Sequence, residues 1–234
     1  MEWLKQEHQD QYEIGILHLK TGEIEERFNT VADNVHRLEN KNSKSLLFKV
    51  VNKLSQGQLA KKQKTPLERT IQSVIAYNYD IIYANTAVAL PVGVEIKKAS
   101  KNKPKLIAHV HELYVGLKRY VPYPKQIVPL LDHVIAVSQV VSNNIINEWK
   151  IGQQNISVVY EFSKLKSKLD SNNINKNNTF TIGASGTVFW RKGYEYFIQV
   201  ARYISSHYPQ INTEFIWVGK INDNEKLIIN EDLK

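Results

Sequence analysis

The chain of 234 residues contains no cysteine. It can therefore form neither disulfides nor thiolate metal sites, and an oxidising compartment is not implied. No run approaches the ~18 apolar residues of a membrane-spanning helix, and residues 1–11 lack the apolar core of a signal peptide. These absences predict a cytoplasmic protein, with peripheral attachment to a membrane left open.

Acidic residues are fewer than basic ones. The chain has 31 Lys and Arg against 23 Asp and Glu, which gives a net charge of +8 and a pI near 9.4. This charge suits nucleotides, nucleic acid or an anionic membrane surface, and it does not choose among them. The lysines are scattered and not interleaved with aromatic residues, which argues against a nucleic-acid binder.

Short apolar runs alternate with amphipathic stretches along the chain. This alternation predicts βαβ units and an α/β fold with a Rossmann-like, doubly wound parallel sheet. The run DIIYA, residues 80–84, predicts a strand that is buried on both faces. The expected strands are residues 12–19, 35–38, 80–84, 105–111, 133–137, 156–160, 179–184 and 214–218. The expected helices are residues 3–9 (the end of a helix), 23–31, 66–77, 86–98 (interrupted by Pro91), 126–131, 138–150 and 193–207.

The composition of the sequence changes after residue 170. Residues 171–178, SNNINKNN, are polar and rich in asparagine, which predicts an interdomain linker. We therefore expect a first domain over residues 1–170 and a second that begins at residue 179. Residues 179–234 supply only a strand, a helix and a strand, so the second domain is expected to be incomplete.

The stretch TFTIGASGTVFWRKG, residues 179–193, has the layout of a phosphate-binding loop. Glycine lets the backbone approach a ligand, and the start of the next helix offers free N–H groups and the positive end of its dipole. Arg191 and Lys192 add full charges. The alternative is a tight turn with two solvated cations. The apolar face expected for the helix comprises Tyr194, Phe197, Ile198, Ala201 and Ile204.

Polar residues end other predicted strands, where ligands of open parallel sheets bind. His109 and His111 fall on the same side of their strand, and Glu112 follows. The pair could be structural, part of an active site or metal ligands, but nothing nearby has metal-ligand spacing. Asn85 and Thr86 could contact a ligand or, as the favoured interpretation, cap the next helix. Gly219 is a weaker candidate for a ligand loop.

Several well-known motifs are missing. The chain has no GxSxG, HExxH or Walker A motif. No GxGxxG follows a strand near the start, which argues against a Rossmann oxidoreductase.

In order and spacing, the motifs resemble those of GT-B glycosyltransferases, and among them the retaining enzymes of family 4, also called group 1. The resemblance spans roughly residues 12–220. It implies two Rossmann-like domains, a nucleotide-sugar donor bound mainly by the second and an acceptor bound mainly by the first. The resembling segments are DIIYANTA (80–87), KLIAHVHEL (105–113), HVIAVSQVVSNNII (133–146), NISVVY (155–160), GASGTVFWRKGYEYFI (183–198) and EFIWVGK (214–220).

The resemblance also implies roles for individual residues. Arg191 and Lys192 match the basic pair that clamps the donor diphosphate, which would stabilise charge on the leaving nucleotide. His111 matches the histidine near the reacting sugar. Gly186 and Thr187 match the loop that touches the phosphates, although many relatives have arginine where Thr187 stands. Further expected substrate contacts are Glu112, Asn85 and Gly219.

The expected activity is transfer of a hexosyl group, with retention, from a nucleotide diphosphate sugar to a hydroxyl of a glycan or glycolipid. Neither a metal nor another cofactor is expected, and the partners would be the donor, the acceptor and an anionic membrane surface. The chain is expected to be truncated at both ends relative to the family, because it begins in the helix after the first strand and ends before a glutamate pair. We therefore expect little activity from residues 1–234 alone. The alternative is a non-catalytic module that binds a nucleotide or sugar.

Overall fold

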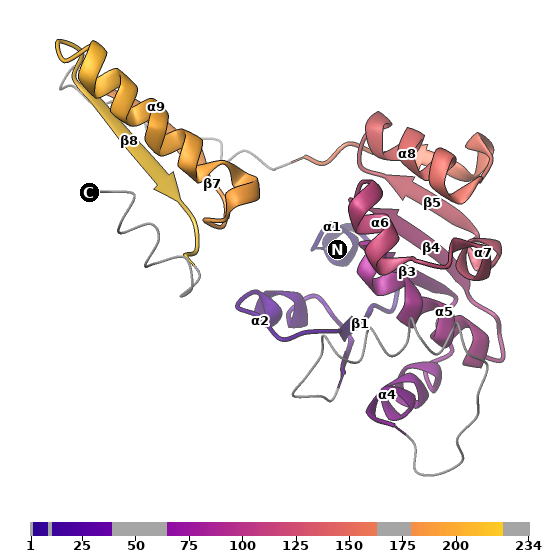
Figure 1. Ribbon diagram of the computed structural model, residues 1–234. Coiled ribbons are helices and arrows are strands. Elements are labelled where there is room, and N and C mark those ends of the chain that lie inside the picture. Colours follow the sequence, from indigo (N-terminus) through magenta and orange to yellow (C-terminus); the bar gives the residue numbers. More distant parts are fainter. Residues whose placement is uncertain (1, 9–10, 39–64, 163–178, 222–234) are drawn as a thin grey trace. The chain divides into compact units, whose positions relative to one another are not determined.

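The computed structural model describes residues 2–8, 11–38, 65–162 and 179–221 (Figure 1). The chain divides into two compact units, Met1–Ser163 (unit 1) and Lys164–Lys234 (unit 2). The predicted linker, residues 171–178, and the predicted domain end at residue 170 lie outside the described residues.

Unit 1 begins with a small parallel sheet. Its strands are β1 (Gly15–His18) and β2 (Asn34–Arg37), which follow α1 (Glu2–Glu7) and enclose α2 (Glu25–Asn29). Helix α4 (Pro66–Ile75) comes next, and a capping box starts it. The Glu68 N–H donates to Thr65 Oγ1 at 3.2 Å, and the Thr65 N–H donates to Glu68 Oε2 at 2.7 Å.

The main sheet of unit 1 has four parallel strands in the order β3-β4-β5-β6. The strands are β3 (Ile81–Asn85), β4 (Lys105–Val110), β5 (His133–Ala136) and β6 (Ile156–Val158). The connections contain η1 (Ala87–Ala89), α5 (Leu90–Ala99), α6 (Tyr114–Tyr120), α7 (Pro124–Ile127), η2 (Val128–Leu130), α8 (Gln139–Trp149) and η3 (Gln153–Asn155). This arrangement confirms the predicted α/β class with parallel, Rossmann-like sheets.

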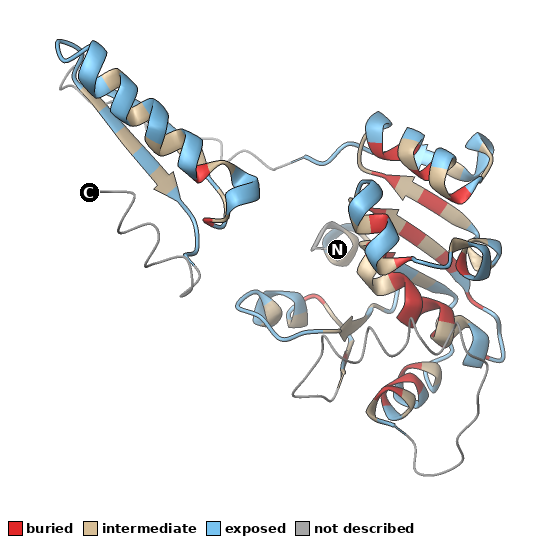
Figure 2. Ribbon diagram, viewed as in Figure 1, coloured by how far each residue is buried: buried red, intermediate tan, exposed pale blue. Residues whose placement is uncertain are grey.

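The core of unit 1 lies between one face of this sheet and the helices α5 to α8. Leu106, Ala108 and Val110 of β4 are fully buried there, while the alternate residues of the strand are not (Figure 2). The expectation that β3 is buried on both faces was wrong. Ile81 and Tyr83 are 55% and 52% exposed, because β3 is an edge strand and, among the described helices, those that pack on it meet its other face.

Three helical segments depart from the predicted pattern. The helix expected at residues 126–131 is replaced by α7, which begins at Pro124, and the 3-10 helix η2. Pro91 does not interrupt a helix from residue 86; it lies in the first turn of α5, where its missing N–H is not needed. Helix α6 was not predicted, because Tyr114–Tyr120 is short and rich in aromatic residues. It is held by Leu117, which is buried against the core.

Unit 2 contains one βαβ element in the described residues (Figure 1). Strands β7 (Phe180–Ser185) and β8 (Thr213–Val218) pair in parallel, with η5 (Trp190–Lys192) and α9 (Tyr194–His207) between them. The five residues predicted to form the apolar face of α9 are its only positions that are not exposed. In the described parts of both units, no helix is long and apolar enough to cross a membrane.

Candidate functional site

In unit 1, the carboxyl ends of β3 and β4 bring together Asn85 and His111. Nε2 of His111 lies 3.0 Å from Asn85 Oδ1, and Nδ1 lies 2.9 Å from Glu161 Oε1. A carboxylate that accepts from Nδ1–H fixes the orientation of an imidazole ring. His111 is therefore held at the rim of the sheet by groups from two other segments.

Glu112 connects the two strand ends through the backbone. Its Oε2 accepts from the N–H of Ala87 at 3.0 Å and from the N–H of His111 at 3.1 Å. One carboxylate oxygen thus joins the start of η1 to the end of β4. The predicted contact between Glu112 and substrate stays a prediction, and the structure gives this residue a role in shaping the rim.

Thr86, between β3 and η1, has an uncommon backbone conformation. Its φ of 75° is positive, which costs a β-branched residue about 1–3 kcal/mol, and strained residues of this kind cluster at functional sites. Thr86 occupies the N-cap position of η1, but no side-chain hydrogen bond caps this helix, so the favoured interpretation of a side-chain cap was wrong. Asn85 faces His111, and Glu112 accepts from the helix start instead. Among the described residues, the buried Thr86 Oγ1 has no hydrogen-bond partner.

His109 and His111 lie on the same side of the sheet, as their spacing predicts. Their ring centroids are 4.5 Å apart, and His109 Nδ1 lies 2.6 Å from Tyr83 Oη. Burial, with a contribution from His111, lowers the pKa of His109, and burial raises the pKa of Tyr83. In the described residues, no group of three or more His, Cys, Asp and Glu side chains could hold a metal ion.

In unit 2, the loop after β7 is pressed against the end of β8. Gly186 has a φ of 139°, and its N–H donates to Val218 O at 2.9 Å. Its carbonyl accepts from Trp217 Nε1 at 2.8 Å. A Cβ on Gly219 would lie 1.8 Å from that same carbonyl oxygen, so only glycine fits there. The predicted phosphate-loop residue Gly186 and the weaker ligand-loop candidate Gly219 are therefore in direct contact.

The two predicted cations follow on η5. Arg191 and Lys192 are both exposed, and so is Thr187. Side-chain carbons of Lys192 lie 3.7–3.8 Å from the position that a Cβ on Gly186 would occupy, so the lysine extends along the glycine loop. Gly193, with a φ of 76°, then starts α9. The loop, a lysine and the positive end of a helix dipole thus meet within one segment of unit 2.

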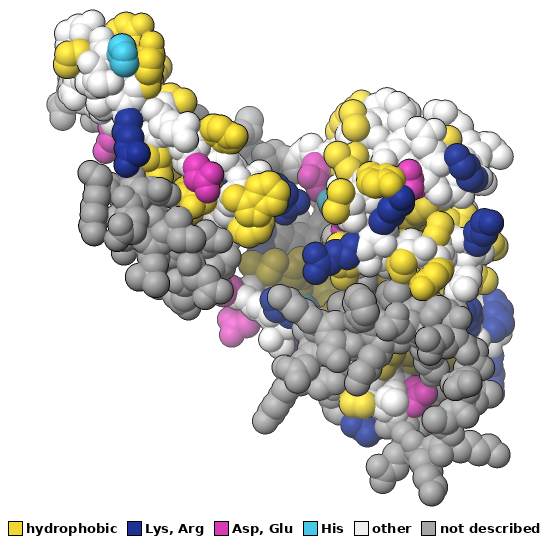
Figure 3. All heavy atoms as spheres, in the orientation of Figure 1, with side chains coloured by type: hydrophobic (Ala, Val, Ile, Leu, Met, Phe, Trp, Pro, Cys, Tyr) yellow, Lys and Arg dark blue, Asp and Glu magenta, His cyan; other side chains and the backbone are white. Residues whose placement is uncertain are grey.

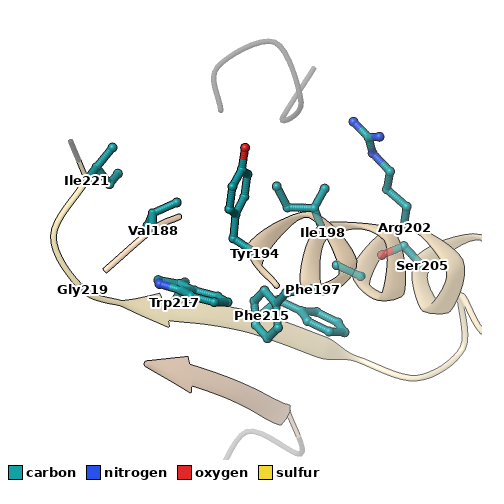
Figure 4. Close-up of a pocket in the computed structure, with 11 residues that line it drawn as sticks. Val188, Tyr194, Phe197, Ile198, Arg202, Ser205, Phe215, Trp217, Gly219 and Ile221 are labelled. Carbon is teal, nitrogen blue, oxygen red and sulfur yellow. The ribbon is translucent and has the colours of Figure 1, made fainter. Parts of the chain in front are cut away.

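A hollow of about 470 Å³ lies between α9 and β8 (Figure 4). Its walls are mostly apolar, with Tyr194 and Ile198 from the helix and Trp217 from the strand. It includes Gly219 at one end, whereas Arg191 and Lys192 are not among its lining residues. The hollow therefore continues the apolar layer between helix and strands. Arg202 of α9 lines it, whereas Arg191 and Lys192 lie outside it.

Two contacts at the rim of unit 1 involve residues that sequence reasoning did not select. Glu161 pairs with His111 across a sequence separation that no motif indicates. Tyr83 reaches His109 because it stands two residues before Asn85 and so shares its face of β3. The alternation of side chains along the strand could have identified Tyr83 as a residue on the same face as Asn85. No motif in the sequence indicates Glu161 as a site residue.

Comparisons with known proteins place this chain in a family. The model of Glycosyltransferase Family 4 matches residues 42–162, about half of the chain. A lipopolysaccharide outer core galactosyltransferase, WaaB, in its apo form is similar in structure, with a TM-score of 0.51 and 14% identity over 93% of this chain and 61% of that one. A glycosyltransferase from Rickettsia africae ESF-5 gives a TM-score of 0.50 and 15% identity over 92% of this chain and 62% of that one.

At these identities the likeness is one of fold, and this chain spans less than two thirds of either structure. A search of curated proteins found no match. The family match and the parallel α/β architecture agree with each other. The chain belongs to glycosyltransferase family 4 and has a GT-B-type fold.

Proposed function

We propose that this chain provides the acceptor side and the donor-phosphate loop of a retaining glycosyltransferase. The reaction would move a hexosyl group from a nucleotide diphosphate sugar to a hydroxyl of a glycan or glycolipid. The proposed location is the cytoplasm, with attachment to an anionic membrane surface. Family membership supports sugar transfer in general, and the specific donor, acceptor and stereochemistry are part of the proposal.

The observation that carries the proposal is the loop of unit 2. The close approach of Gly186 and Gly219 fixes the backbone, and Lys192 extends along it at the start of α9. The positive end of a helix dipole and two full charges can neutralise a diphosphate without a metal ion. The same groups would stabilise the charge that develops on the leaving nucleotide, so they would act most strongly in the transition state.

His111 is the proposed group near the reacting sugar. Asn85 and Glu161 hold its ring, which suits a residue that orients or polarises the substrate. Its neighbours Glu112 and Thr86 shape the backbone around it, so the rim is set before a ligand arrives. No protein nucleophile is assigned, in keeping with the retaining class that the sequence resembles.

Donor binding can be tested by calorimetric titration with UDP-, GDP- and ADP-sugars. We expect one of these to bind, and Lys192→Ala to weaken it about 10- to 100-fold, as expected when a hydrogen bond to a charged group is lost. Lys101→Ala removes an exposed lysine from unit 1 and serves as the control. Equal affinity for wild type and Lys192→Ala would place the clamp elsewhere. Binding without any transfer of sugar would favour the alternative, a non-catalytic nucleotide- or sugar-binding module.

A further inference from the structure

His36 of β2 is a buried histidine that takes no part in the candidate site. It is 8% exposed, and its ring faces helix α4 and the turn between α4 and β3. On the face of unit 1 that Figure 3 shows, hydrophobic and basic side chains are prominent outside the grey residues, and little histidine is visible. A buried imidazolium is costly unless a carboxylate pairs with it. The residues around His36 therefore decide whether it can carry a proton on both nitrogens.

The hydrogen bonds around His36 assign it the neutral form. Ser73 Oγ donates its proton to Thr70 O at 2.8 Å, so towards His36 it accepts from Nδ1–H, at 3.2 Å. The lone pair of His36 Nε2 then faces Tyr79 Oη at 3.5 Å. Burial, with a contribution from Glu13, raises the pKa of Tyr79 to about 12, so this hydroxyl keeps its proton and is the donor.

Two tyrosine rings enclose other sides of the imidazole. Tyr77 and Tyr79 are stacked with their centroids 5.7 Å apart, and they meet the His36 ring edge-on, at 5.3 Å and 6.4 Å. The Tyr79 hydroxyl also lies against Gly15 of β1 and leaves no room there for a Cβ. His36 thus connects β2 to α4, and Tyr79 extends the same contact to β1.

The described residues offer no carboxylate to compensate a charge on His36. Its two nitrogens contact the hydroxyls of a serine and a tyrosine. Charged or titratable side chains on the elements around it are Glu13, His18, Asp33, Arg37, Glu68, Arg69, Tyr77 and Tyr79. In the described structure none of the carboxylates among them bonds to His36, and burial lowers the pKa of this histidine.

A second proton on the imidazole would place a positive charge inside this contact. We propose that protonation of His36 releases the small β1–β2 sheet from helix α4, so that the contact opens in mildly acidic solution. This proposal concerns the scaffold of unit 1 and does not rest on the proposed function.

The direction and the pH range of the opening follow from linkage. A histidine whose pKa is lower in the closed state binds its proton more readily once the contact is open. Opening is therefore favoured as the pH falls below the ordinary value of about 6.5, by up to about tenfold for each pH unit, until the pH reaches the closed-state value. The Ile14 N–H and Lys5 lower the pKa of Asp33, so this neighbouring carboxylate titrates in more acidic solution.

Hydrogen exchange and histidine NMR together test the proposal. Exchange of the β2 and α4 amides, corrected for its intrinsic dependence on pH, is followed from about pH 7.5 to pH 5, where histidines titrate. NMR of isotope-labelled histidine reports the protonation of His36 in the same samples. We expect the β2 and α4 amides to lose protection as His36 titrates, while the amides of α8 do not. In His36→Phe, which keeps a ring but cannot titrate, this loss should disappear.

Two further variants make the test specific. Tyr79→Phe keeps the ring but removes the O–H that donates to Nε2, so the transition should move up towards the ordinary histidine value. His133→Gln is the matched control, because His133 also contacts a serine, with Nε2 2.8 Å from Ser157 Oγ, but is not buried. Titration of His36 at or above its ordinary value would overturn the proposal. So would an unchanged pH dependence in both His36→Phe and Tyr79→Phe, or an equal loss of protection in α8.

Discussion

The two units of this chain are built from the same βαβ element but differ in how much of it is buried. In unit 1, helices α5 to α8 cover one face of the main sheet, and strands β4 and β5 contribute side chains that are 0% exposed. In the described part of unit 2, the single helix α9 covers two strands. The buried hydrophobic residues of this part are Val188 and Tyr194. The scaffold of unit 1 is therefore the more extensively packed.

The two rims are also fixed by different means. In unit 1, carboxylates hold the strand ends: Glu112 accepts two backbone N–H groups at one end of β4, and Asp132 accepts from the Leu106 N–H at the other. In unit 2, the ends of β7 and β8 are held by steric fit, because Gly219 has no Cβ and so leaves room for the Gly186 carbonyl. The first kind of rim depends on charge, and the second depends on the absence of a Cβ.

Truncation of a core side chain should separate the two units most clearly. Leu106→Ala removes a fully buried side chain from unit 1 and is expected to cost about 2–5 kcal/mol of stability. Ile198→Ala removes a half-buried side chain from α9 of unit 2, so its cost should be smaller. Denaturant unfolding followed by peptide-resolved hydrogen exchange reports on each unit. If Ile198→Ala lowered the free energy of unfolding as much as Leu106→Ala, unit 1 would not be the more extensively packed of the two units.

A second substitution tests the steric rim of unit 2. In Gly219→Ala the new Cβ would collide with the Gly186 carbonyl oxygen, and we expect a loss of about 1–3 kcal/mol, as for other overpacked sites. Gly183→Ala is the matched control. A Cβ there would meet nothing within 4 Å, and in a strand interior the change should stabilise the unit by about 0.5–1 kcal/mol. Thermal unfolding of both variants measures the difference, and a change of the same sign in the two would rule out this account of the rim.

Much of the scaffold could be predicted from the sequence, because its signals are local. The capping box at Thr65 and the apolar face of α9 follow from residue types at fixed spacings. The contact between His111 and Asn85 could also have been predicted, because the two residues stand at the ends of neighbouring parallel strands. Contacts that depend on the fold could not be predicted from the sequence. Glu161 contacts His111 from a segment that is distant in the sequence. Glu112, and not Thr86 as expected, accepts the hydrogen bond from the N–H at the start of η1.

The smallest expected effect concerns acid and the charged end of β4. Asp132 accepts from Lys97 and from the Leu106 N–H, and although burial alone would raise its pKa, these bonds and the nearby lysines lower it. A carboxyl whose pKa is lower in the folded state stabilises that state above its unfolded pKa of about 3.9. The contribution is lost as the pH falls through the lower, folded value.

We therefore expect unit 1 to lose stability in acid, and Asp132→Asn to remove part of that loss while weakening unit 1 at neutral pH. The effect should be modest, because the Asp132 side chain is 38% exposed and water screens its charge. Urea unfolding of wild type and Asp132→Asn over a pH series, with hydrogen exchange of the Leu106 amide, measures it. The steric contact of Gly186 with Gly219 contains no titrating group, so exchange at the Gly186 amide should depend less on acid. If acid opened both amides equally, and Asp132→Asn changed neither, charge would not be what distinguishes the ends of β4 from the glycine contact of unit 2.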